Sequence, residues 1–253
     1  MKILITVSYV GTAYMGYQLQ KDKPTVALML NRATKKAFGI ECNVTGCSRT
    51  DSGVHALGFC ATVEPKNPEE KITVPIEKIP VALNSVLPDD ICVLKAKAVK
   101  DDFHARYSVV KKEYVYKIRT EGVRDPFLAG KVLEYGRKIS DESLEKMQVG
   151  ASHFVGTHNF DAFMSTGSQI ENTERTVYKS YLVRKGNIVE FHVMADGFLY
   201  NMVRIMVGTL LDIEKGKIDE NSVPEIIESK DRKRAGGTAK PDGLYLKKIY
   251  YKH

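Results

Sequence analysis

The stretch VTGCSRTDSGVHALGFCATV, residues 44–63, decides how the first part of the chain folds. Its two ends are typical of strands, whereas its middle collects polar and reactive side chains that a continuous strand would not carry. Glycines at 46, 53 and 58 permit backbone conformations closed to other residues, so the middle can form a tight, shaped loop. The reactive residues are Cys47, Ser48, Arg49, Thr50, Asp51 and His55. Because such loops concentrate function, we predict a functional loop between two strands.

The elements around this stretch follow from hydrophobic periodicity. Residues 2–9 alternate with the period of a strand. Residues 25–38 carry apolar side chains at helical spacing and stop at Gly39, a residue that commonly caps helix ends. The order predicted for this half is strand 2–9, helix 25–38, strands 41–47 and 57–64, helix 76–86 and strand 91–99.

The same order of elements recurs after the segment DDFHARYSVV. We predict strand 110–120, helix 141–154, strands 176–185 and 187–195 turning at Gly186-Asn187, helix 199–215, a short helix near 223–229 and strand 244–251. Both halves show a split βαβ pattern, as in proteins that bind single-stranded RNA. The prediction is an α+β fold of two RNA-recognition-like βαββαβ halves, residues 1–105 and 106–253. We expect a mostly antiparallel central sheet to fuse the two halves, with helices packed on it and a central catalytic cleft.

Composition narrows the class of protein. The chain has 253 residues and a net charge of +7, which favours a polyanion such as nucleic acid as its partner. The first ten residues do not resemble a signal peptide, and no run approaches the length of a membrane span. We therefore expect a soluble, cytoplasmic protein whose cysteines are reduced thiols.

Asp51 is the candidate catalytic residue of the loop. It precedes Ser52-Gly53, where an aspartate is often a turn residue that binds nearby amides. A catalytic role requires a partner that keeps the carboxylate ionised. Arg204 is the candidate, because it stands at the margin of an apolar helical stripe with almost no other charge nearby. A guanidinium would hold Asp51 ionised and oriented, whereas the alternative for Arg204 is an arginine that faces solvent.

Residues 111–119 suggest a surface that binds RNA. Tyr114 and Tyr116 share one face of the predicted strand, where an aromatic residue either fills the core or stacks on an unpaired base. We expect nearby cations to meet phosphates: Lys111, Lys112, Lys117, Arg119 and, in the preceding segment, His104 and Arg106. His55 is a further candidate substrate-binding residue.

Other interpretations of the loop remain. The series Cys42, Cys47, His55 and Cys60 has the order of a zinc knuckle without its tight spacing. Because Cys42 and Cys60 fall in predicted strands, buried free thiols are the stronger interpretation. A Ser-His-Asp hydrolase built from Ser48 or Ser52 with His55 and Asp51 lacks the context of a nucleophile elbow.

The chain resembles the tRNA pseudouridine synthases of the TruA type. Matching segments run along almost the whole sequence: YVGTAYMGYQLQ, GCSRTDSGVHA, NSVLPDDICV, DDFHARYSVVKKEYVY, THNFDAF, FLYNMVRIMVGTLLDIEKGK and GGTAKPDGLYL. Their order and spacing make the resemblance specific. Three positions depart from the usual pattern, namely Tyr17 for tryptophan, Ser48 for glycine and TAKPDGL for an Ala-Pro-Ala version.

The resemblance implies roles for particular residues. Asp51 would be the catalytic aspartate and Arg49 would fill the gap left by a flipped uridine. Tyr114 would stack on the target base, and Arg204 would pair with Asp51. The resemblance also implies a homodimer, without metal or cofactor, that acts on the anticodon stem-loop of tRNA. A non-catalytic RNA-binding protein with the same surface is the competing function.

Overall fold

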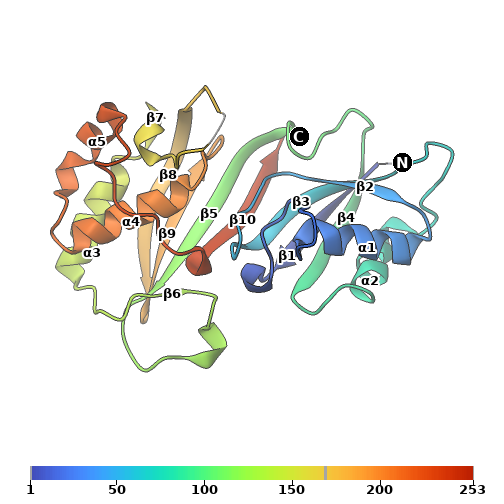
Figure 1. Ribbon diagram of the computed structural model, residues 1–253, viewed down its shortest axis with the longest axis horizontal. Coiled ribbons are helices and arrows are strands. Elements are labelled where there is room, and N and C mark those ends of the chain that lie inside the picture. Colours follow the sequence, from blue (N-terminus) through green and yellow to red (C-terminus); the bar gives the residue numbers. More distant parts are fainter. Residues whose placement is uncertain (1, 168–169, 253) are drawn as a thin grey trace. The chain divides into compact units, whose positions relative to one another are not determined.

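The computed structural model describes residues 2–167 and 170–252, which form two compact units (Figure 1). Unit 1 comprises Met1–Val110 with Tyr245–His253, and unit 2 comprises Lys111–Leu244. The end of the chain therefore packs with its beginning. The division into halves 1–105 and 106–253 stays a prediction.

Unit 1 has the order βαββαβ, completed by the last strand of the chain. Its elements are β1 (Lys2–Tyr9), η1 (Gly11–Ala13), α1 (Val26–Phe38), β2 (Cys42–Gly46), β3 (His55–Pro65), η2 (Ile76–Lys78), α2 (Ile79–Asn84), β4 (Ile91–Val99) and β10 (Leu244–Tyr251). The Thr25 hydroxyl accepts from Leu28 N at the start of α1, and Gly39 ends the helix at a φ of 71°. These capping contacts explain why the helix begins and stops where the sequence predicted.

Strand β3 organises the sheet of unit 1. One edge of β3 pairs antiparallel with β1, which in turn pairs antiparallel with β4. The other edge is shared: residues 61–65 pair antiparallel with β2, and residues 55–56 pair in parallel with β10. The start of β3, directly after the loop at 47–54, is thus held by a strand from the far end of the chain. Side chains such as Ile5, Leu30 and Phe59 are fully buried in the core of this unit.

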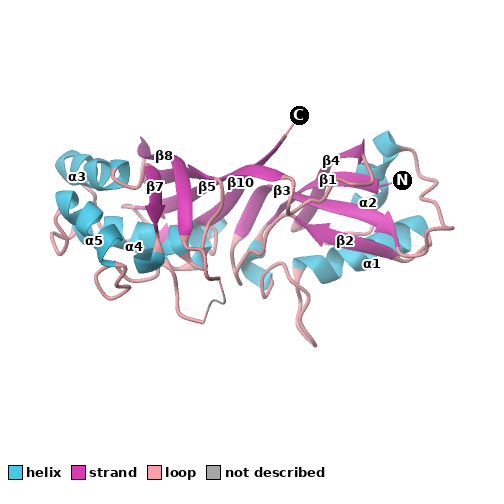
Figure 2. Cartoon of the chain, turned by 90° about the horizontal axis from the view of Figure 1, so that it is seen from above, coloured by secondary structure: helices cyan, strands magenta, loops and turns pink. Residues whose placement is uncertain are grey.

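Unit 2 contains a second antiparallel arrangement with its own helices. Its elements are β5 (Val109–Arg119), η3 (Pro126–Leu128), β6 (Leu133–Glu134), α3 (Asp141–Ser152), β7 (Gly156–Asn159), η4 (Asp161–Phe163), β8 (Glu174–Lys185), β9 (Ile188–Ala195), α4 (Met202–Glu214), η5 (Glu220–Ser222), α5 (Val223–Ser229) and η6 (Pro241–Gly243). The strand order is β5-β9-β8-β7, all antiparallel, with β6 parallel to β5. Helix α3 packs on α4 and β8, and Figure 2 shows α3, α4 and α5 on one side of β7 and β8.

The predicted α+β class and mostly antiparallel pairing are confirmed. Strands 2–9 and 91–99, helix 223–229 and strand 244–251 have the predicted bounds, and most other elements shift by one to three residues. The predicted helix 76–86 divides into a 3-10 turn and the shorter α2. Strands β6 and β7 were not predicted, because two and four residues are too few to show a period.

Candidate active site

The loop at residues 47–54 is clamped by two earlier segments of unit 1. The hydroxyls of Tyr9 and Thr50 share a buried hydrogen bond of 2.8 Å. The amide of Tyr17 donates to the carbonyl oxygen of Thr50 at 3.1 Å. Thr50 is therefore fixed through both its side chain and its backbone, which orients the residues on either side of it.

A second set of contacts fixes the far side of the loop. The Tyr14 carbonyl accepts from Gly53 N at 3.2 Å and from the Ser52 hydroxyl at 3.3 Å. Val54 N closes a turn on the Asp51 carbonyl at 3.1 Å. The Tyr14 hydroxyl donates to Asp90 at 2.5 Å, and burial together with this bond raises the pKa of Tyr14. Asp51 therefore sits in a turn whose backbone is held at both ends.

Gly16 makes this close approach of backbones possible. It has a φ of +82°, and a Cβ built there would lie 2.4 Å from the carbonyl oxygen of Thr50. A side chain at this position would be strained and would push the loop away. The clamp consequently requires glycine at position 16.

The clamp divides the side chains of the loop by exposure. Arg49 is exposed, Thr50 is buried with only 6% of its surface exposed, and Asp51 is half-buried. Thr50 acts as the anchor between two charged side chains. The arrangement presents an arginine and a carboxylate on a rigid turn, which is a suitable platform for chemistry on a bound substrate.

His55 is fully buried at the end of this loop. Its Nδ1 accepts from Gly11 N at 2.9 Å, and its ring stacks on Tyr245 with centroids 4.6 Å apart. These contacts join the loop to η1 and to β10 and indicate a positioning role. A direct contact between His55 and RNA stays a prediction. The hydrolase alternative gains no support, because Ser52 donates to a backbone carbonyl and His55 Nδ1 is occupied by Gly11.

Arg204 lies in unit 2, in the first turn of α4. Its Nε donates to the Ala239 carbonyl and its Nη1 to Asn201 Oδ1, both at 2.7 Å. The Ala239 amide returns a bond of 3.1 Å to the Arg204 carbonyl. The side chain is half-buried, whereas nearly every other residue in the first turns of α4 is buried. The predicted position of Arg204 at the margin of an apolar stripe is confirmed, and its pairing with Asp51 stays a prediction.

Tyr114 lies on β5 and is 6% exposed. Its ring meets Phe198 edge-on, with centroids 5.0 Å apart and planes at 82°. Tyr116 on the same strand is fully buried, and its hydroxyl donates to the Lys240 carbonyl at 2.6 Å. Tyr116 is thus part of the core, and a stacking role for Tyr114 stays a prediction.

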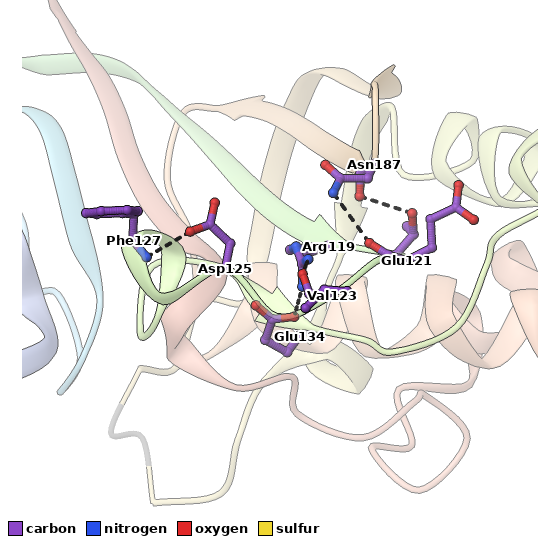
Figure 3. A network of polar contacts seen from close by, with 8 residues as sticks. Arg119, Glu121, Val123, Asp125, Phe127, Glu134 and Asn187 are labelled. Atoms are coloured by element: carbon purple, nitrogen blue, oxygen red, sulfur yellow. Dashed lines mark hydrogen bonds and ion pairs between the residues drawn. The ribbon is translucent and has the colours of Figure 1, made fainter.

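The expectation that Arg119 meets phosphates is wrong. Arg119 is 4% exposed and donates to the Glu134 carboxylate at 2.7 Å and to the carbonyl of Val123 (Figure 3). Its guanidinium therefore holds the segment that follows β5, and its charge is paired with Glu134 within the protein. Strand alternation alone could not distinguish it from Lys111, Lys112 and Lys117, which are half-buried.

The residues of the zinc alternative do not assemble into a metal site. Cys42, Cys47 and Cys60 are buried thiols outside any disulfide, as the stronger interpretation predicted. Burial raises the pKa of Cys42 to about 11. Within residues 2–167 and 170–252, no group of three or more His, Cys, Asp or Glu side chains lies close enough to share a metal ion.

Comparison with known proteins decides the family. The family model described as tRNA pseudouridine synthase matches residues 5–108 and 151–252. The chain belongs to the tRNA pseudouridine synthase family. The family prediction, and with it that of an isomerase, is confirmed.

Curated relatives of the tRNA pseudouridine synthase family align over nearly the whole chain. The tRNA pseudouridine synthase A of a Thermoanaerobacter species is 46% identical over 249 residues, which cover 98% of this chain and 99% of that protein. Those of Acetivibrio thermocellus and Clostridium acetobutylicum are 43% and 41% identical over the same coverage. Asp51 and Arg204 fall inside the two ranges matched by the family model, whereas Tyr114 lies in the unmatched segment between the two ranges. Among the helices of the described residues, none has the length and apolar character to cross a membrane.

Sequence reasoning missed Tyr9, Tyr14 and Tyr107. Tyr9 and Tyr14 clamp the loop, and Tyr107 is exposed beside Arg106. The first two lie in the segment YVGTAYMGYQLQ, whose density of tyrosine and glycine was the available signal. For Tyr107 the signal was an aromatic residue next to His104 and Arg106.

Proposed function

We propose that this synthase converts uridine to pseudouridine in the anticodon stem-loop of tRNA, with Asp51 as its catalytic residue. The observation that carries the proposal is the clamped loop. Thr50, adjacent to Asp51, is held by Tyr9 and Tyr17, and the following turn is held by Tyr14. A carboxylate on so constrained a backbone meets the requirement that a catalytic group be positioned before the substrate arrives.

The chemistry requires an ionised carboxylate and little else. The reaction breaks the bond between uracil N1 and ribose C1′, turns the ring and joins C5 to C1′. C5 loses a proton and N1 gains one, so the conversion involves no redox change and no net hydrolysis. Asp51 serves as nucleophile or as general base in this sequence.

Other residues assist in the proposed mechanism. Arg204 pairs with Asp51 and keeps it ionised, because a guanidinium favours the charged form of a carboxylate. A base inside a stem must leave the stack, at a cost of about a few kcal/mol. Stacking on Tyr114 offsets this cost, and Arg49, which is exposed, fills the space that the uridine leaves. Arg106, which is exposed, and His55, which acts from its buried position by holding the loop, complete the residues assigned to substrate binding.

The proposal includes a homodimer that works in the cytoplasm. A whole tRNA extends beyond one small protein chain, and closed two-fold pairing is the commonest way to enlarge a binding surface. Each chain contributes a net charge of +7, which favours binding of an anionic RNA.

Incubation with tRNA labelled with tritium at C5 of uridine tests the reaction directly. Because C5 exchanges its proton for the bond to C1′, pseudouridine formation releases the label. We expect stoichiometric release by the wild-type chain. Binding of tRNA without release of tritium would identify a non-catalytic RNA-binding protein instead. Light scattering during turnover tests the dimer, and full activity at concentrations where only monomer is present would reject it.

A further inference from the structure

An open groove of about 380 Å³ lies within unit 1, beside the catalytic loop. Its lining includes Gly46 at the end of β2, Arg49 of the loop and, on the segment before β5, His104, Arg106 and Tyr107. In the proposed mechanism Arg49 fills the space left by the uridine and Arg106 binds substrate, whereas Tyr107 has no role. The groove therefore offers a binding surface that the catalytic proposal does not yet explain.

The turn at residues 104–108 is held in place by hydrogen bonds within it and to Tyr251. His104 Nδ1 accepts from the amides of Arg106 at 3.1 Å and Tyr107 at 3.3 Å. Ser108 N donates to the His104 carbonyl at 3.0 Å, and the Ser108 hydroxyl accepts from His104 N at 3.2 Å. Buried Ala105 is anchored by a 2.8 Å bond from the Tyr251 hydroxyl to its carbonyl. A preorganised turn of this kind loses little entropy when it binds.

The side chains that project from this turn suit a nucleotide. Because Nδ1 of His104 accepts hydrogen bonds, the ring proton lies on Nε2, which makes that atom a donor. Tyr107 is 77% exposed, with its ring 4.3 Å from that of His104 and 5.8 Å from the Arg106 guanidinium carbon. An accessible aromatic ring beside a cation and a hydrogen-bond donor can bind a base and its phosphate together.

Gly46 and Tyr17 pack closely together in the lining of the groove. A Cβ at Gly46 would lie 2.4 Å from the ring of Tyr17. Tyr17 is 6% exposed and also lines the groove. Glycine lets the strand lie directly on this ring. Among the strands of the described residues β2 pairs with β3 alone, so its other edge offers main-chain groups to a ligand.

We propose that this groove is a subsite for an unpaired nucleotide that flanks the target uridine in the RNA. The base stacks on Tyr107, and the phosphate is bound by Arg106 and by the Nε2–H of His104. Arg49 lines the same groove. A nucleotide bound there would therefore adjoin the loop that carries Asp51. The inference rests on the proposed function, because it takes RNA as the substrate.

The test is a binding cycle between Tyr107 and individual bases of the RNA. Anticodon stem-loop RNAs that carry one abasic nucleotide at successive loop positions are titrated against the wild-type chain, Tyr107→Ala and Tyr107→Phe. We expect Tyr107→Ala to weaken binding of intact RNA about tenfold, the scale of one base stacked on an aromatic ring, and Tyr107→Phe to bind like wild type. With the RNA that lacks the stacked base, the wild-type chain should bind about tenfold more weakly. Tyr107→Ala should then weaken binding of that RNA no further.

Two further variants separate the phosphate contact from a general structural defect. Arg106→Gln should lower the slope of log affinity against log salt by about 0.7, the value for one phosphate of a single strand. Tyr181→Ala is the matched control, because Tyr181 is also exposed and stacks on a histidine, His192, but lies in unit 2. It should leave affinity unchanged.

Unchanged binding by Tyr107→Ala would overturn the subsite, and so would a loss that persists at every abasic position. Tritium release by the wild-type chain is scored separately. Release combined with unaltered binding by Tyr107→Ala rejects the subsite and leaves the proposed function standing. Absence of release rejects the proposed function, while the abasic cycle still decides whether the groove binds a base.

Discussion

The two units solve the same connection in different ways. In unit 2, β8 and β9 form a hairpin closed by Gly186 and Asn187 alone. In unit 1, β2 and β3 form the corresponding hairpin, but residues 47–54 separate its strands. Since a two-residue turn suffices to join antiparallel strands, folding does not require the longer loop. The added residues are those that carry the proposed chemistry.

The polar contacts of the two connections also differ. In unit 2, the Asn187 carbonyl accepts from Thr120 N and the Asn187 side chain donates to the Glu121 carbonyl, so the turn supports its neighbours. In unit 1, Tyr9 and Tyr14 support the loop. The short turn supports its neighbours, whereas the longer loop is itself supported by the rest of its unit.

The largest effect expected from this contrast is on catalysis by the long loop. Asp51→Asn keeps the shape of the side chain and removes its charge, so we expect turnover to fall by on the order of 10³-fold or more. Tritium release measures the rate, and thermal unfolding and tRNA titration should remain near wild type. Asp89→Asn, at an exposed aspartate, is the control. Turnover within tenfold of wild type would assign the chemistry to another residue.

Matched glycine substitutions compare the two connections directly. Gly16→Ala places a Cβ 2.4 Å from the Thr50 carbonyl at a φ of +82°, so we expect it to destabilise the fold by at least about 2 kcal/mol. Gly186→Ala also has a positive φ, +60°, but its Cβ meets nothing within 4 Å, so about 1 kcal/mol of backbone strain is expected. Urea denaturation measures both. Equal costs would show that the clamp at Gly16 adds nothing to backbone strain.

Arg204→Met tests the hydrogen bonds of the Arg204 guanidinium in unit 2 and its proposed pairing with Asp51. The change removes bonds to the Ala239 carbonyl and to Asn201, for which we expect a loss of about 2 kcal/mol, together with loss of activity. The free energy of unfolding and tritium release are both measured. Arg234→Met is the control, because Arg234 is exposed and its guanidinium forms long contacts of 3.5 Å with Glu225. Wild-type activity in Arg204→Met would end the proposed partnership with Asp51.

The smallest effect concerns the hydrogen bond that anchors Thr50. Tyr9→Phe removes a buried bond of 2.8 Å and should cost about 1 kcal/mol. Thr50→Val removes the same bond from the other side. In a double-mutant cycle the combined variant should cost clearly less than the sum of the single changes. Additive costs would mean that this bond does not couple the loop to β1.

Several features of the site were predictable from residues close together in sequence. The loop at 47–54 was marked by its glycines and reactive side chains between two strands, and Arg204 by its position on an apolar stripe. The buried contacts of His55 with Gly11 and Tyr245 carried no such signal, because both partners come from distant segments. The interpretation of Arg119 failed for the same reason, since Glu134 belongs to a two-residue strand that has no recognisable period.

The sequence by itself determined the order of the elements and the family of this chain, because periodicity, capping residues and short motifs are properties of neighbouring residues. The tertiary structure alone decided that β10 holds the start of β3, that Arg119 is internal while Arg49 is exposed, and that His104, Arg106 and Tyr107 share a groove with the loop at residues 47–54. Each of these depends on segments far apart in the chain. Hydrogen bonding and burial at such contacts are set by packing in three dimensions, which local patterns do not encode.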